Sequence, residues 1–145
     1  EGRLRRPSLV MGATNPPASI LDPKIARQVA AMLETVTGPE GTGQKARVDN
    51  YRVSGQTGTS RKASAAGYAS RYIASFAGFA PSCDPRLVAV AVINDPSGDV
   101  YYGGLVAGPL FSNVMAGALR LLNVPPDNYQ GMVAQSAADV AGGGQ

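Results

Sequence analysis

The chain has 145 residues, of which 44% are hydrophobic and 16% are charged, and its formal net charge at pH 7 is +3. This length suits one domain or part of one, and the composition argues against a disordered acidic or basic tail. The absence of histidine excludes a Ser-His-Asp or Cys-His centre and any His-based metal site within this chain, and we expect no metal and no cofactor. The basic charge is too small to predict a nucleic-acid partner.

The N-terminal part of the chain predicts an irregular segment followed by one helix. Residues 1–21 are rich in proline and predict the irregular segment. Asp22 can cap a helix and Pro23 suits its first position, while Gly38 and Pro39 end it. The expected apolar face of this helix consists of Ile25, Val29, Met32 or Leu33, and Val36.

Three strands and a second helix are expected next. The strands are predicted at residues 51–60, 72–80 and 87–93, with a loop of roughly a dozen residues after Arg61 and a short loop at 81–85. Such loops favour antiparallel pairing. The second helix is predicted over residues 107–122, with Pro109 in its first turn, and residues 127–145 predict a flexible tail. The expected buried stripe of the second helix consists of Leu110, Val114, Ala118 and Leu121 or Leu122.

These elements predict an α+β fold in which antiparallel β-strands are flanked by helices. The run 87–93 is continuously apolar, which is typical of a strand buried on both faces, and it is too short to span a membrane. A three-stranded sheet with such a strand needs further packing partners. We therefore expect residues 22–126 to be part of a larger domain.

The tetrapeptide Gln56-Thr57-Gly58-Thr59 lies within the first expected strand. Glycine inside a strand often marks the close approach of a ligand or another backbone, and the period of two places the Thr57 and Thr59 hydroxyls on the same face. One interpretation is a site for a carboxylate and an extended peptide. The other is a threonine-rich edge strand with a bulge glycine.

Five stretches surround and include this tetrapeptide: YRVSGQTGT (51–59), SFAGFAP (75–81), INDP (93–96), YYGG (101–104) and PLFSNVM (109–115). In their order and spacing they resemble the class B penicillin-binding proteins of cell division. The resemblance covers roughly residues 22–128 and implies the C-terminal part of a penicillin-binding-protein and serine β-lactamase-like transpeptidase domain.

The resemblance is incomplete at the motifs that this family uses for catalysis, which are Ser-x-x-Lys, Ser-x-Asn and Lys-Thr-Gly. No serine of the chain is followed by lysine three positions on or by asparagine two positions on. The resemblance therefore implies that the catalytic serine and its base lie on upstream sequence. The third motif is present with Gln56 in place of lysine. Either Arg61 or Arg71 compensates for the missing charge, or activity is reduced.

The resemblance also implies roles for individual residues. Thr57 and Thr59 would hold the substrate or β-lactam carboxylate beside Gln56, Gly58 would give clearance, and the backbone N–H of Thr59 would complete an oxyanion hole. An aromatic wall beside the acyl side chain is implied for Tyr72, Tyr101 and Tyr102. The alternative for these tyrosines is ordinary packing.

The function implied is that of a septal peptidoglycan D,D-transpeptidase, which cross-links stem peptides ending in D-Ala-D-Ala through an acyl-serine and is acylated by β-lactams. The implied partners are the upstream half of the domain and membrane proteins of the divisome. The implied location is the periplasmic face of the bacterial inner membrane, with an anchor that is absent from this chain. A catalytically inactive peptide-binding or division-scaffold module remains the alternative.

Overall fold

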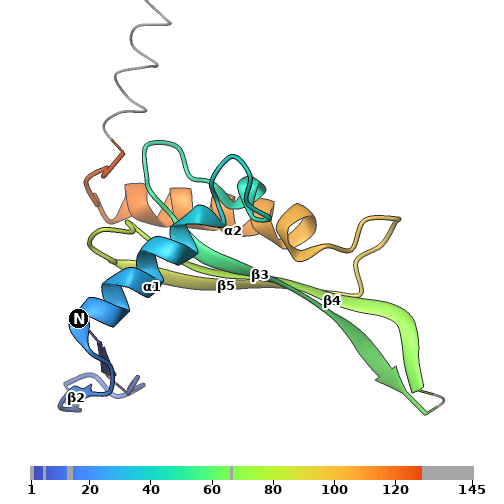
Figure 1. Ribbon diagram of the computed structural model, residues 1–145, viewed down its shortest axis with the longest axis horizontal. Coiled ribbons are helices and arrows are strands. Elements are labelled where there is room, and N and C mark those ends of the chain that lie inside the picture. Colours follow the sequence, from blue (N-terminus) through green and yellow to red (C-terminus); the bar gives the residue numbers. More distant parts are fainter. Residues whose placement is uncertain (1, 5, 13–14, 66, 129–145) are drawn as a thin grey trace, which may run out of the picture.

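The computed structural model describes residues 2–4, 6–12, 15–65 and 67–128. Within these residues three antiparallel strands form a sheet that is flanked by helices, as predicted, and one helix lies on each face (Figure 1). The elements are β1 (Arg3–Leu4), β2 (Ala18–Ser19), α1 (Pro23–Thr35), the 3-10 helix η1 (Gln44–Ala46), β3 (Ser54–Ser64), β4 (Gly67–Ala80), β5 (Leu87–Asn94) and α2 (Gly103–Leu121). The strand order in the sheet is β3-β4-β5.

The core lies between α2 and one face of the sheet. Phe76 of β4 is fully buried against Phe111 of α2, with 4.8 Å between their ring centroids. Along α2, the buried stripe runs through Ala107, Phe111, Met115 and Leu119. The predicted stripe is wrong by one residue, because Leu110, Val114, Leu121 and Leu122 are exposed. The helix is apolar on several sides, so spacing alone does not give its phase.

The bounds of α2 also differ from the prediction. The helix begins at Gly103, four positions before the predicted start, which places Pro109 inside the helix. By length and composition alone α2 is apolar enough to cross a membrane, as core helices of soluble domains also are. Here its buried stripe packs on the sheet, which is the position of a core helix.

Helix α1 begins and ends close to the predicted bounds. The Asp22 side chain accepts a hydrogen bond from the Lys24 N–H at 2.7 Å, and Pro23 occupies the first turn. The helix lies on the sheet face opposite α2, because the Ser54 hydroxyl on that face donates to the Ala30 carbonyl at 2.9 Å. The predicted apolar face is present, but Ile25, Val29 and Met32 are all exposed.

The predicted loop after Arg61 is wrong. Strands β3 and β4 continue to Ser64 and Gly67 and form a long hairpin that projects beyond β5 (Figure 1), since β5 pairs only with residues 73–80. A register shift lies between Arg61 and Ala63. The alanines and serines in this segment have weak strand preference, so the local sequence does not reveal the pairing.

Both ends of the described chain are more ordered than predicted. Residues 1–21 are not wholly irregular, because β1 and β2 form a short antiparallel pair. The first residue of the predicted flexible tail is held in place, since the Asp127 carboxylate accepts from the Arg52 N–H at 2.7 Å. The Asn128 N–H donates to the Asn50 carbonyl at 3.1 Å. The rest of the predicted tail, residues 129–145, lies outside the described residues.

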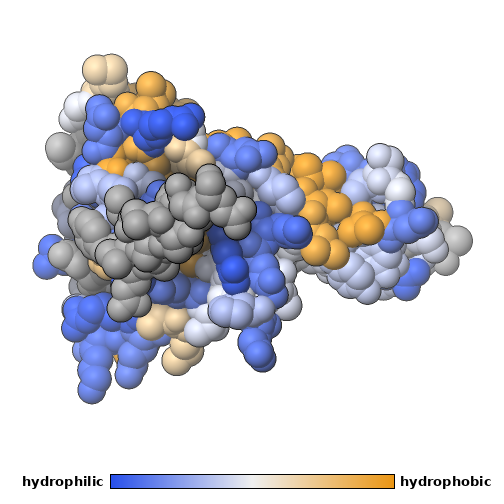
Figure 2. Space-filling model, turned by 90° about the horizontal axis from the view of Figure 1, so that it is seen from above, coloured by the Kyte–Doolittle hydropathy of each residue, from blue (hydrophilic) through white to orange (hydrophobic). Residues whose placement is uncertain are grey.

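One face of β5 is open in this chain. Val88, Val90 and Val92 are 78%, 65% and 54% exposed, while Ala91 on the α2 side is buried. The prediction that this strand is buried on both faces is therefore wrong for the described residues. Figure 2 shows that apolar surface is also open beside the projecting hairpin. Exposed apolar surface of this kind marks a place where another part of a protein packs.

Candidate functional site

The outer edge of β3 is the first feature of the site. Among the described residues β4 is the only strand that pairs with β3. Three hydrogen bonds of β3 and of the two residues before it show which backbone groups point outward. The Arg52 carbonyl accepts from the Ser82 N–H just past β4 at 2.9 Å, so it points inward. The Val53 carbonyl accepts from the Thr37 hydroxyl at 2.8 Å, and the Thr57 N–H donates to the Gln56 side chain at 3.1 Å. These two groups point outward.

Backbone groups of an antiparallel edge strand alternate between the partner strand and the free edge. The odd-numbered residues of β3 before the register shift therefore present their N–H and C=O groups at the free edge. Thr57 and Thr59 are among them. The sheet thus has an open edge at the predicted tetrapeptide, where an extended peptide can add as a further strand.

The side chains of Thr57 and Thr59 lie on the same sheet face, as predicted. Their cross-strand partners are Phe76 and Ala74, both of which are buried beneath α2. The Thr57 hydroxyl lies 3.1 Å from the Thr42 hydroxyl, and the Thr59 hydroxyl accepts from the Gly103 N–H at 3.0 Å. Because the Thr59 oxygen is an acceptor in that bond, its own proton remains available to a ligand.

The clearance at Gly58 is taken up by the Ser75 side chain of β4, and the start of α2 approaches the Gly58 backbone. A Cβ on Gly58 would lie 2.4 Å from the Ser75 hydroxyl oxygen, and a Cβ on Gly103 would lie 2.3 Å from the Gly58 carbonyl oxygen. A Cβ on Gly104 would lie 1.9 Å from the Thr42 carbonyl oxygen. The start of α2 and the Thr42 loop therefore press directly onto the candidate strand.

The side chain of Gln56 is exposed and folds back along its own strand. It supplies an acceptor to the Thr57 N–H, and it carries no charge. The Gln56 side chain therefore occupies the Thr57 N–H, which is one of the donors at the free edge. An incoming strand would have to displace this side chain to reach that donor.

The two arginines considered as compensating cations differ in their contacts. Arg71 donates to the Asp95 carboxylate from Nε at 2.7 Å and also from Nη2, and this ion pair raises the pKa of Arg71. Arg61 pairs with Tyr72 across the strands, which places its side chain on the face of Thr57 and Thr59. Among the described residues, no hydrogen-bond or ion-pair partner contacts the Arg61 guanidinium. Arg61 is therefore the available cation.

The three predicted tyrosines lie together. The ring centroids of Tyr72 and Tyr101 are 3.9 Å apart with the rings nearly parallel, and those of Tyr101 and Tyr102 are 4.7 Å apart. Hydrogen bonding to Tyr102 and then to Tyr72 raises the pKa of Tyr101 to about 12. Tyr101 therefore stays neutral near pH 7, and the three rings offer an aromatic surface beside Arg61.

Sequence reasoning did not assign a role to Thr42 or to the Gly103-Gly104 pair. The Gly-Thr-Gly loop at residues 41–43 and the glycine pair at a helix start were the available signals, because adjacent glycines permit close backbone contact. Among the described residues, no cluster of three or more acidic, histidine or cysteine side chains could hold a metal.

The comparisons with known proteins agree on one family. The family model described as the penicillin binding protein transpeptidase domain matches residues 1–116. The probable peptidoglycan D,D-transpeptidase PbpC of Pseudomonas aeruginosa is 51% identical over 112 residues, 76% of this chain and 20% of that protein. The peptidoglycan D,D-transpeptidase FtsI of Escherichia coli is 43% identical over 113 residues, 77% of this chain and 19% of that protein.

A solved structure gives the same result. The apo TP domain of penicillin-binding protein 3 from Burkholderia pseudomallei superposes with a TM-score of 0.69 at 44% identity, covering 78% of this chain and 35% of that one. The present chain spans about a fifth of the length of the curated relatives it matches.

Proposed function

Because the chain belongs to the penicillin binding protein transpeptidase domain family and is a partial domain of that kind, we propose that it acts within a longer peptidoglycan D,D-transpeptidase of cell division. Its part is to bind the stem peptide on β3. The observation that carries the proposal is the open edge at Thr57 and Thr59, with two hydroxyls on one face and outward N–H groups.

The proposed chemistry is acyl transfer through a serine ester. A serine on the upstream part attacks the carbonyl carbon of the penultimate D-Ala, and the terminal D-Ala leaves with a proton. An amine of a neighbouring stem peptide then displaces the serine oxygen and forms the cross-link. The Thr59 N–H donates to the carbonyl oxygen as its negative charge develops, while the Thr57 and Thr59 hydroxyls bind the terminal carboxylate. A β-lactam acylates the same serine.

The surfaces that this chain leaves open support an upstream half as partner. The valines of β5 are exposed on a strand whose other face packs under α2, and helix α1 exposes its apolar face and has no buried residue. Burial of such a valine contributes roughly 1.5–3 kcal/mol, so a matching upstream surface would stabilise the complete domain. The full-length protein would be anchored at the periplasmic face of the inner membrane and work with membrane proteins of the divisome.

We expect a Gln56→Lys substitution in the full-length protein to raise the rate constant of acylation by a fluorescent penicillin about tenfold. A charge-assisted hydrogen bond is roughly twice as strong as a neutral one, and about 1.4 kcal/mol corresponds to a factor of ten. Arg61→Gln is expected to lower the rate in the wild-type background by a similar factor. It should lower the rate by less when combined with Gln56→Lys, because the two cations act on one carboxylate. A loss with Arg71→Gln and none with Arg61→Gln would contradict this assignment.

Covalent labelling by a fluorescent penicillin tests the proposal as a whole. This chain alone should remain unlabelled, and the full-length protein, or this chain mixed with the upstream half, should be labelled on the upstream part. A folded full-length protein that takes no label would favour the inactive binding module, for which the neutral Gln56 is the supporting observation. Labelling of this chain alone would overturn the site, with Ser60 as the first serine to test.

A further inference from the structure

We propose that the ion pair of Glu34 and Arg52 is a positioning device for the substrate strand. The ion pair fixes the position of the β3 root, defined as residues 52–54. It thereby sets the position of the free-edge backbone groups and hydroxyls of Thr57 and Thr59. The inference rests on the proposed function, since it concerns the placement of the groups that bind the stem peptide. It assigns a role to two residues that contact no substrate.

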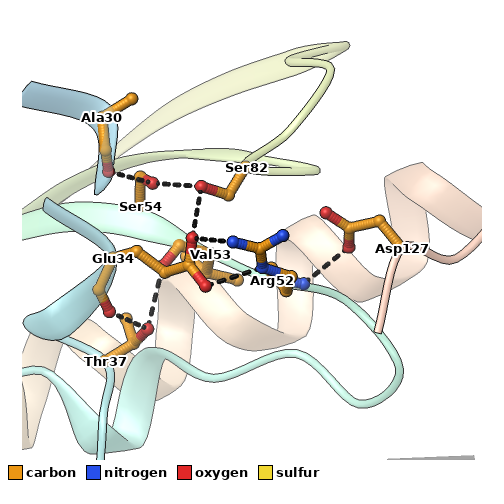
Figure 3. Close-up of polar contacts among 8 residues, drawn as sticks. All are labelled: Ala30, Glu34, Thr37, Arg52, Val53, Ser54, Ser82 and Asp127. Atoms are coloured by element: carbon orange, nitrogen blue, oxygen red, sulfur yellow. Dashed lines mark hydrogen bonds and ion pairs between the residues drawn. The ribbon is translucent and has the colours of Figure 1, made fainter. Parts of the chain in front are cut away.

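The geometry of this pair is that of a rigid fork. Arg52 donates from Nε to Glu34 Oε1 at 2.7 Å and from Nη2 to Oε2 at 2.8 Å, and the Ser82 hydroxyl donates to Oε2 at 2.9 Å (Figure 3). Two parallel bonds fix the guanidinium plane as well as its distance. Burial opposes ionisation of Glu34, but hydrogen bonds from Arg52 and Ser82 outweigh it and hold the pKa of Glu34 below its ordinary value. The carboxylate is therefore ionised at neutral pH.

Three segments meet at the β3 root besides the strand itself. From α1 and its C-terminal end, the Ala30 carbonyl accepts from the Ser54 hydroxyl at 2.9 Å, and the Thr37 hydroxyl donates to the Val53 carbonyl at 2.8 Å. After β4, the Ser82 hydroxyl lies 2.6 Å from that of Ser54. After α2, the Asp127 carboxylate accepts from the Arg52 N–H. Figure 3 shows these groups gathered around the β3 root.

This convergence matters because β3 is supported on one side only. From residue 55 onward the outer edge of β3 pairs with no other described strand. In the proposed function that edge is open for the substrate. A displacement of the root is transmitted along the extended strand to Thr57 and Thr59. A misplacement of about 1 Å at reacting groups can lower a rate about 100-fold. Thr37 also closes the outer edge at Val53, so the open edge begins beyond the root.

The test compares two arginine–carboxylate pairs of the same sheet in the full-length protein. Arg52→Lys keeps the charge at the root but loses the fork, and we expect the acylation rate constant for a fluorescent penicillin to fall tenfold or more. The labelled fraction at long times should remain complete. The exchanged pair Glu34→Arg with Arg52→Glu should recover most of the rate. Arg71→Lys disrupts the pair with Asp95 away from the root and should leave the rate within about twofold.

A merely structural role has a different signature. It would lower the melting temperature and the labelled fraction together, with an unchanged rate constant in the molecules that still react, and that result would overturn the proposal. If the wild-type protein takes no label, the proposed function fails, and hydrogen exchange decides the positioning separately. Inward amides of Gln56 and Gly58 should then exchange faster in Arg52→Lys while those of α2 do not change. Equal exchange rates of the β3 amides in the wild type and in Arg52→Lys would overturn the positioning proposal.

Discussion

Replacing Gly103 with alanine is expected to lower the free energy of unfolding by about 3 kcal/mol, since overpacking of this severity lies at the upper end of such effects. The new Cβ would lie 2.3 Å from the carbonyl oxygens of both Gly58 and Ser75. Both atoms belong to paired strands, so neither can rotate away. Relief requires the start of α2 to move off the sheet, which would break the bond from the Gly103 N–H to the Thr59 hydroxyl.

Gly117→Ala is the matched control because it lies in the same helix. Apart from the neighbouring residues and the backbone of its own helix, no atom lies within 4 Å of a Cβ at that position. Alanine there should stabilise the protein by about 0.5–1 kcal/mol, since it removes backbone freedom from the unfolded chain. Urea unfolding of both variants and of the wild type measures the three free energies of unfolding. Equal stability would contradict the close contact between α2 and β3.

The features that were predictable from sequence depend on local signals. Helix α1 carries a capping Asp22 and a first-turn Pro23, and it begins where these two residues place it. The shared face of Thr57 and Thr59 follows from the period of a strand alone. The gathering of Tyr72, Tyr101 and Tyr102 came from the family resemblance rather than from any spacing in the chain.

The features that escaped prediction depend on contacts distant in sequence. The phase of α2 follows from its packing on the sheet, where Phe111 lies against Phe76 and Met115 is buried, while the equally apolar Leu110 and Val114 are exposed. The β3 root was not predicted because Glu34, Arg52 and Ser82 are polar residues far apart in the sequence. Only the folded chain brings their three segments together. Which edge of β3 is open also follows only from its pairing with β4.

Thr59→Pro is expected to lower the acylation rate constant of the full-length protein about 10²–10³-fold below that of a Thr59→Val variant, which is the effect of removing one oxyanion-hole donor. Proline lacks the N–H that the proposed mechanism uses. The substitution is compatible with the fold because this N–H points to the free edge, and edge strands accept proline where no ladder bond is lost. The preceding Gly58 is already extended, as a residue before proline prefers to be.

Thr59→Val separates the backbone donor from the side chain. Valine keeps the N–H and the branched shape but loses the hydroxyl, so it should lower the rate about 10–100-fold, as expected for one hydrogen bond to a charged carboxylate. Both variants lose the acceptor for the Gly103 N–H, so their ratio isolates the backbone donor. Stopped-flow labelling measures that ratio, and the labelled fraction shows whether each variant is folded. A ratio near one in folded protein would mean that the oxyanion donor lies elsewhere, and that β3 binds the peptide without polarising the carbonyl that reacts.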